Sequence, residues 1–218
     1  MTDVEAINFT KDIFDLIKKA KTIEDLECIP DKMEIPIKNR MNIDGYPKIE
    51  FSISATEIKL LQDSKILDDN YKFASDITSK LTDPLAKILY ATVWKNGDLK
   101  KVRHIIKGVL DSDVENSEQD DALVFYQFGK YLTKLQGQPI IDQHVIRAFA
   151  VYKLLDSDQI SSLRKIELIN KRHKPIINLY KEWLTSRELT NELKNFKDYT
   201  YHIDKLLFAT GKSIKERS

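Results

Sequence analysis

Residues 128–149 read FGKYLTKLQGQPIIDQHVIRAF, and this stretch decides both the fold class and the choice of functional residues. Apolar side chains recur at roughly helical spacing up to Leu135, which predicts a helix. Gly137 is placed to end that helix, and Pro139 cannot continue it. A second apolar series of helical spacing, residues 145–150, follows Asp142. We therefore predict a helix, a tight turn and a second helix that begins on Asp142.

Asp142 has two interpretations. As an N-cap, its carboxylate accepts hydrogen bonds from the first N–H groups of the helix, and aspartate is common at this position for that reason alone. The positive end of the helix also favours an ionised carboxylate. A carboxylate held in this way beside apolar residues is also suited to catalysis, because it can activate water or stabilise a developing cation. The local pattern leaves both interpretations open.

The composition is that of an ordinary globular protein. The 218 residues are 42% hydrophobic and 32% charged, and only 6 glycines and 6 prolines occur, which argues against a loop-rich all-β protein. No apolar run approaches the length of a membrane span, and the acidic N-terminus does not resemble a signal peptide. The single cysteine, Cys28, excludes an internal disulfide. We therefore expect a cytoplasmic protein without a membrane partner.

The net charge of +1 limits the kinds of partner that the chain can have. Dedicated nucleic-acid-binding proteins carry a strongly basic balance, which this sequence lacks. Any binding to DNA therefore requires a local basic patch.

Helical start and stop signals recur along the whole chain. Thr2 with Glu5 and Ser54 with Glu57 form capping boxes. The pair Asp83-Pro84 predicts another helix start, and Asn96-Gly97 ends that helix. We expect its buried stripe to consist of Leu85, Ile88, Leu89, Val93 and Trp94. In total we predict about ten helices, an all-α fold and a single compact domain over residues 1–218.

Two segments depart from the helical pattern. Residues 28–53 contain three prolines and Gly45, which predicts an irregular N-terminal connector. Within it, residues 33–37 and 49–53 alternate apolar and polar side chains, so the connector holds at most a small hairpin or an extended segment. Gly211 is placed to end the last helix, which leaves residues 212–218 as a charged tail.

The motif PIIDQHVIR, residues 139–147, resembles the Gly/Pro-Asp element of the helix-hairpin-helix DNA glycosylases. The resemblance covers residues 120–153, and the helix from Pro84 to Trp94 corresponds more loosely to one that opens a groove in that family. It implies an orthogonal bundle of helices that binds DNA without a cofactor. It also implies that Asp142 assists the departure of a damaged base from its sugar.

The sequence departs from this family at two functional elements. The family holds a DNA phosphate with a glycine-rich hairpin, whereas residues 114–121 contain no glycine and are acidic. Bifunctional members carry a nucleophilic lysine where this chain has Ala122, Leu123 and Val124. The resemblance therefore implies a monofunctional glycosylase, a hydrolase of DNA repair. The alternative is a non-catalytic interaction protein that kept the fold without the chemistry.

Candidate DNA-binding residues lie on both sides of the motif. Lys100, Arg103, His104 and Lys107 share one helical face and form a candidate phosphate-contacting stripe, although such a face is often merely solvated. Arg147 is a further candidate for binding nucleic acid. Trp94 and Tyr126 are candidates for stacking on a flipped base, although aromatic residues at helical spacing often belong to a core. The four histidines are isolated in sequence, so we expect no metal site.

Overall fold

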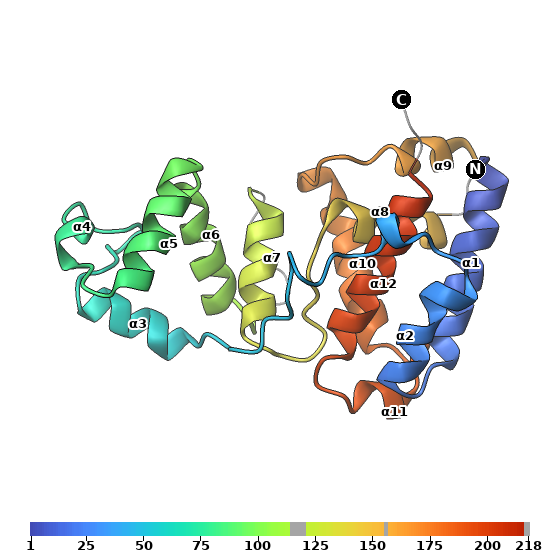
Figure 1. Cartoon of the computed structure of the whole chain (residues 1–218), viewed down its shortest axis with the longest axis horizontal. Coiled ribbons are helices and arrows are strands. Elements are labelled where there is room, and N and C mark those ends of the chain that lie inside the picture. Colours follow the sequence, from blue (N-terminus) through green and yellow to red (C-terminus); the bar gives the residue numbers. More distant parts are fainter. Residues whose placement is uncertain (114–120, 155–156, 216–218) are drawn as a thin grey trace. The chain divides into compact units, whose positions relative to one another are not determined.

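A computed structural model describes residues 1–113, 121–154 and 157–215, and the fold of these residues is all-α (Figure 1). They form twelve α-helices and two short 3₁₀ helices. No strand occurs in the described part of the chain, where Leu67 and Phe73 make a single isolated β-bridge. The predicted all-α class is confirmed. The orthogonal arrangement resembling DNA glycosylases stays a prediction.

The chain divides into two compact units, whereas we expected one compact domain from the sequence. The terminal unit consists of Met1–Ile49 and Gln136–Ser218, and the central unit consists of Glu50–Leu135. The motif at residues 128–149 therefore begins in the central unit and ends in the terminal unit.

The terminal unit is built around α8, whose residues 145–151 are all buried. Four aromatic side chains, Phe14, Phe149, Tyr180 and Trp183, pack together there with ring centroids 4.9 to 6.1 Å apart. Apolar burial of this kind is the main source of stability in such a unit. The unit contains α1 (Asp3–Lys19), α2 (Ile23–Lys32), η1 (Ile37–Asn39), α8 (Gln143–Lys153), α9 (Ser157–Arg164), η2 (Lys171–His173), α10 (Lys174–Thr185), α11 (Asn191–Lys194) and α12 (Tyr199–Ser213).

Gly211 lies inside α12 and does not end it, which corrects the prediction. A Cβ atom on Gly211 would come closer than 3.0 Å to the carbonyl oxygen of His144, so glycine here permits the close approach of α12 to α8. The helix continues to Ser213, and Ile214 after it is fully buried. The predicted charged tail is therefore wrong for residues 212–215, and residues 216–218 lie outside the described part.

The connector at residues 28–53 is more ordered than predicted. Pro30 lies within α2, which continues to Lys32 because Leu26 and Ile29 anchor it in the core. The carbonyl of Pro30 accepts hydrogen bonds from the side chain of Arg40 and from the N–H of Ile35. Residues 33–37 and 49–53 do not pair as a hairpin, and the second segment is extended.

The central unit depends on a close crossing of α6 and α7. A Cβ on Gly108 would come closer than 3.0 Å to the carbonyl oxygen of Tyr126, and a Cβ on Gly129 would clash in the same way with Ile105. The two backbones therefore meet with no side chain between them. The unit contains α3 (Ala55–Asp63), α4 (Ile77–Lys80), α5 (Pro84–Lys95), α6 (Leu99–Leu110) and α7 (Leu123–Leu132).

The predicted buried stripe of α5 is not buried. The exposed fractions are 63% for Leu85, 63% for Ile88, 56% for Leu89 and 64% for Trp94, and no residue of this helix is buried. The helix start is as predicted, because the Asp83 side chain accepts a hydrogen bond from the N–H of Ala86 at 2.8 Å. The local signals therefore predicted the helix correctly. No element of the described chain covers its apolar side.

We expect Gly211→Ala to destabilise the protein by about 2 kcal/mol, measured by urea denaturation. The new methyl group meets backbone atoms of His144, which cannot move as a side chain can. This cost exceeds the gain in helix propensity of roughly 1 kcal/mol. Gly45→Ala is the matched control in the same unit, because its Cβ would meet only ordinary contacts from 3.5 Å. Equal stability of the two variants would contradict the crossing as described.

Candidate functional site

Asp142 occupies the predicted position as the N-cap of α8. Its Oδ1 accepts a hydrogen bond from the N–H of His144 at 2.5 Å. The other oxygen, Oδ2, has no hydrogen-bond partner among the described residues, and the side chain is half-buried. Asp142 thus presents one carboxylate oxygen that is fixed and one that is free.

The turn before Asp142 differs from the prediction. Helix α7 ends at Leu132, so Gly137 does not cap it. Gly137 instead has a φ of +76° in a longer connector, a conformation that favours glycine.

Asp204 on α12 holds this connector in place. Its Oδ2 accepts a hydrogen bond from the N–H of Ile140 at 2.6 Å, and its Oδ1 lies 2.6 Å from the hydroxyl of Tyr180. Complete burial raises the pKa of Asp204 to about 8, so the carboxyl is protonated at neutral pH. Asp204 is not among the functional residues predicted from the sequence. Its only signal is its place beside the apolar residues Ile203, Leu206 and Leu207.

Arg147 lies in the core and not on a DNA-facing surface. Its side chain is fully buried, and its guanidinium donates hydrogen bonds to the carbonyls of Gly211, at 2.8 Å, and Ile166. A group bound in this way cannot reach a phosphate. Its position therefore does not support the predicted contact with nucleic acid.

His144 lies between Asp142 and Arg147. Its Nδ1 is 2.6 Å from Nη1 of Arg147, and because a guanidinium only donates, Nδ1 accepts and the ring proton lies on Nε2. Burial lowers the pKa of His144, although the nearby carboxylate of Asp142 opposes this shift. The imidazole is therefore neutral at pH 7.

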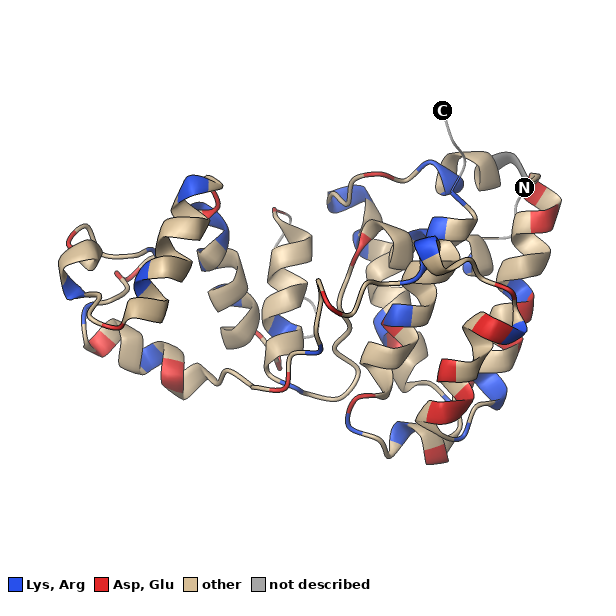
Figure 2. Ribbon diagram, in the orientation of Figure 1, with Lys and Arg blue, Asp and Glu red and all other residues tan. Residues whose placement is uncertain are grey.

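The predicted basic stripe exists on α6, in the central unit. Lys100, Arg103 and Lys107 are exposed, and their spacing of i, i+3 and i+7 puts them on one face; Figure 2 marks the basic residues of this helix in blue. His104 is half-buried, and its Nε2 accepts a hydrogen bond from Nε of Arg103 at 3.3 Å. This stripe and Asp142 belong to different units.

The two candidate stacking residues have opposite surroundings. Trp94 is largely exposed on α5. Tyr126 is only 5% exposed, and its hydroxyl donates a hydrogen bond to Asp111 at 3.0 Å. Only Trp94 is therefore available to stack on a base.

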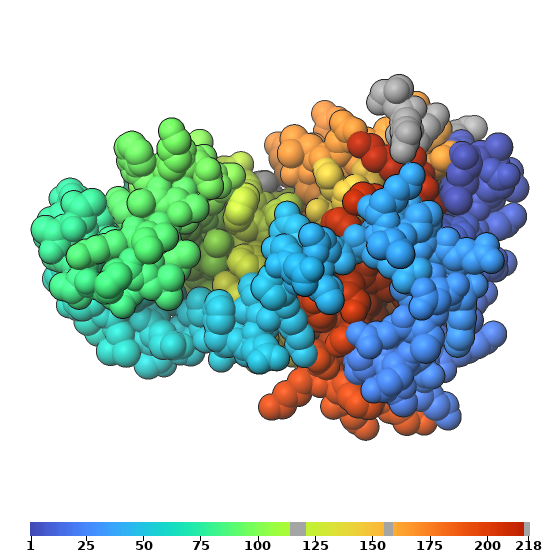
Figure 3. All heavy atoms as spheres, viewed as in Figure 1, coloured from blue at the N-terminus to red at the C-terminus, as the bar shows by residue number. Residues whose placement is uncertain are grey.

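The terminal unit also contains a pocket of about 250 Å³ between α2, α12 and residues 40–43. In Figure 3 the surface of this unit is hollowed between α2 and the segment that follows η1, with α12 behind. The lining side chains include apolar residues from all three segments and four titratable residues. The lining residues are Leu26, Glu27, Pro30, Arg40, Met41, Ile43, His202, Lys205, Leu206 and Ala209.

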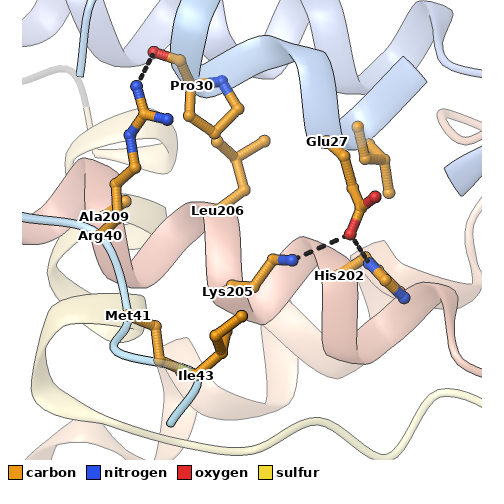
Figure 4. A pocket seen from close by; sticks show the side chains of 10 residues that line it. Glu27, Pro30, Arg40, Met41, Ile43, His202, Lys205, Leu206 and Ala209 are labelled. Carbon is orange, nitrogen blue, oxygen red and sulfur yellow. Dashed lines mark hydrogen bonds and ion pairs between the residues drawn. The ribbon is translucent and has the colours of Figure 1, made fainter. Parts of the chain in front are cut away.

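The charged side chains of this pocket are already paired. Oε1 of Glu27 lies 3.0 Å from Nζ of Lys205 and 3.3 Å from Nδ1 of His202 (Figure 4). The guanidinium of Arg40 is paired with Asp31 at 2.7 Å. The hydrogen bond from Lys205 lowers the pKa of Glu27, and burial lowers the pKa of His202. Because its charges are already paired, the pocket supports no specific ionic ligand.

Neither a metal site nor a membrane span is found in the described residues. Across residues 1–113, 121–154 and 157–215, no three His, Cys, Asp or Glu side chains come together as a metal site. Over the same ranges, no helix combines the length and apolar character that crossing a bilayer requires.

Comparison with protein-family models, with curated proteins and with solved structures finds no match to this chain. The resemblance to helix-hairpin-helix glycosylases therefore rests on the motif around Asp142.

We expect the stability of the protein to fall between about pH 4 and about pH 8 because of Asp204. In the unfolded chain this carboxyl titrates near its ordinary value, whereas in the folded protein its pKa is about 8. Its contribution is therefore fully present below pH 4 and is lost as the pH rises through 8, at about 1.4 kcal/mol per pH unit. Unfolding by urea at several pH values measures this slope.

Asp204→Asn should remove this part of the pH dependence, because the amide resembles the protonated carboxyl. Tyr180→Phe is the control, since it removes the hydroxyl partner but keeps the buried carboxyl. It should lower the stability and retain the slope. If Asp204→Asn leaves the slope unchanged, the carboxyl is not protonated in the folded protein.

Proposed function

We propose that this chain is a DNA glycosylase-like protein that cleaves the N-glycosidic bond of a flipped base with Asp142 as its essential residue. The proposal rests on one observation. Asp142 is fixed through Oδ1 by the start of α8 while Oδ2 is free and half-exposed. In this arrangement the cap bond to Oδ1 orients the carboxylate, and Oδ2 remains available to a substrate.

The proposed reaction needs only the groups that the chain supplies. The bond from the sugar C1′ to the base breaks with its electron pair leaving on the base, and the carboxylate of Asp142 stabilises the cation that develops on the sugar. Water then adds to C1′, Asp142 takes up its proton, and this proton passes to the departed base anion, which restores the carboxylate. No lysine is involved, because Ala122 and Leu123 stand where bifunctional glycosylases carry one. Lys100, Arg103 and Lys107 would contact phosphates, and Trp94 would stack on a base.

We expect Asp142→Asn to abolish glycosylase activity on oligonucleotides that carry a panel of damaged bases. Asparagine caps a helix as well as aspartate does, so the fold and its thermal stability should be retained. The expected loss is at least about a hundredfold in single-turnover rate, because the charge that stabilises the cation is removed. Activity that survives the substitution would exclude this mechanism.

A second candidate function is a non-catalytic interaction protein. It is supported by α5, where none of the twelve residues is buried although most are apolar. The acidic segment at residues 111–121 also disfavours a phosphate-binding hairpin, although its residues 114–120 lie outside the described part.

DNA binding separates the two functions through its dependence on salt. The slope of log affinity against log salt reports the number of phosphates contacted. The triple variant Lys100→Ala, Arg103→Ala, Lys107→Ala should lower this slope by roughly 2 to 3. The control Lys19→Ala, Lys38→Ala, Lys59→Ala removes the same charge from exposed positions elsewhere and should leave the slope unchanged. Equal slopes in the two variants would exclude the α6 stripe as the DNA contact.

A further inference from the structure

The exposed side of α5 is an apolar surface that no described element covers. Leu85, Ile88 and Leu89 follow one another at i, i+3 and i+4, and each is more than half exposed. A helix that is apolar around most of its circumference is normally buried. Single exposed leucines are common on protein surfaces, but a contiguous stripe of this kind marks an interaction site.

A groove between α5 and α6 continues this stripe. Its volume is about 230 Å³, which is enough to hold apolar side chains of another chain. Apart from the hydroxyl of Tyr90, the lining side chains carry no polar atom. They are Phe73, Leu81, Ala86, Leu89, Tyr90, Val93, Leu99 and Val102. Leu89 belongs both to the groove and to the exposed stripe, so the two form one surface, which we call the α5 surface.

The charges beside the α5 surface are basic, and they have no ionic partner in the part of the chain that the structure describes. Lys95 follows the stripe on α5, Lys100 is next in sequence to the groove residue Leu99, and Arg103 is next in sequence to Val102. Within residues 1–113, 121–154 and 157–215, none of these three cations makes an ion pair.

The acidic side chains near the α5 surface already have partners. Asp98 pairs with Lys101 at 2.5 Å, and Asp83 caps α5. A partner that covers the α5 surface therefore gains by bringing negative charge to its rim.

We propose that the α5 surface binds an amphipathic helix of a partner protein, with apolar side chains in the groove and acidic side chains beside Lys95, Lys100 and Arg103. This is the helix-in-groove mode of peptide recognition. The proposal rests on the second candidate function and does not depend on the chemistry of Asp142. A second copy of the chain fits less well, because a two-fold pairing of α5 surfaces would bring like charges together.

The test uses two labelled helical peptides of about 18 residues, long enough to form a helix when bound. Both carry leucines at i, i+3, i+4 and i+7, but one has glutamates and the other lysines on its polar face. In fluorescence anisotropy, the full-length protein should bind the glutamate peptide at least about tenfold more tightly than the lysine peptide. The charge-reversed variant Lys95→Glu, Arg103→Glu should invert this preference.

The apolar contribution is tested with Leu85→Ser, Ile88→Ser, which should weaken binding of the glutamate peptide by roughly tenfold or more. Both side chains are exposed, so the fold should be unaffected. Leu60→Ser is the matched control, because Leu60 is similarly exposed but lies outside the groove, and its affinity should equal the wild type. Asp142→Asn should also bind normally, which separates this test from the test of catalysis.

Three results would overturn the proposal. The first is equal affinity for the two peptides, or no binding to either. The second is a dimer in sedimentation that Leu85→Ser, Ile88→Ser dissociates, which would assign the surface to a second copy. The third is adsorption to phosphatidylglycerol vesicles that the same variant abolishes, without binding to the glutamate peptide, which would assign it to a lipid surface.

Discussion

The crossing of α8 and α12 is the constraint on which the terminal unit depends. Gly211 lets the two backbones meet, and the guanidinium of Arg147 then bonds the carbonyl of Gly211. A second bond from Arg147 reaches Ile166, so one side chain joins both helices to the segment after α9. A buried arginine is costly unless its donors are bound, and backbone carbonyls serve here in place of a carboxylate. The close approach is what brings those carbonyls within reach.

The same crossing explains why Asp142 is held so firmly. Before Asp142, the N–H of Ile140 donates a hydrogen bond to Asp204 of α12. After it, Arg147 of α8 donates a hydrogen bond to the carbonyl of Gly211, also in α12. The cap bond to His144 then fixes the carboxylate itself. A capping aspartate and a catalytic aspartate are therefore not competing interpretations, because the contacts that make the cap rigid also orient the free oxygen.

Local signals in the sequence predicted the features that depend on neighbouring residues alone. The capping boxes of Thr2 and Ser54, the start of α5 at Asp83 and the cap at Asp142 all formed, because each is completed within three residues. Contacts between distant segments gave no such signal. A glycine that ends a helix and a glycine that admits a neighbouring helix look alike in sequence, which is why Gly211 was misassigned.

The sequence could not predict the burial of Arg147 and Asp204 or the exposure of α5, for related reasons. Arginine and aspartate are usually exposed, and only the surrounding fold shows that backbone carbonyls accept hydrogen bonds from Arg147 and that a tyrosine hydroxyl lies against Asp204. For α5, periodicity showed that the helix has an apolar side but not whether anything covers it.

The basic face of α6 in the central unit takes part in both proposals. Lys100 and Arg103 would contact phosphates in the glycosylase proposal, and they flank the groove that would receive an acidic helix. Two polyanions that use the same cations cannot bind together without repulsion, and each raises the apparent dissociation constant of the other. Lys107 lies further along α6, away from the groove-lining residues, so its loss should affect DNA more than the peptide. An acidic partner on the α5 surface would therefore act as an electrostatic competitor of DNA.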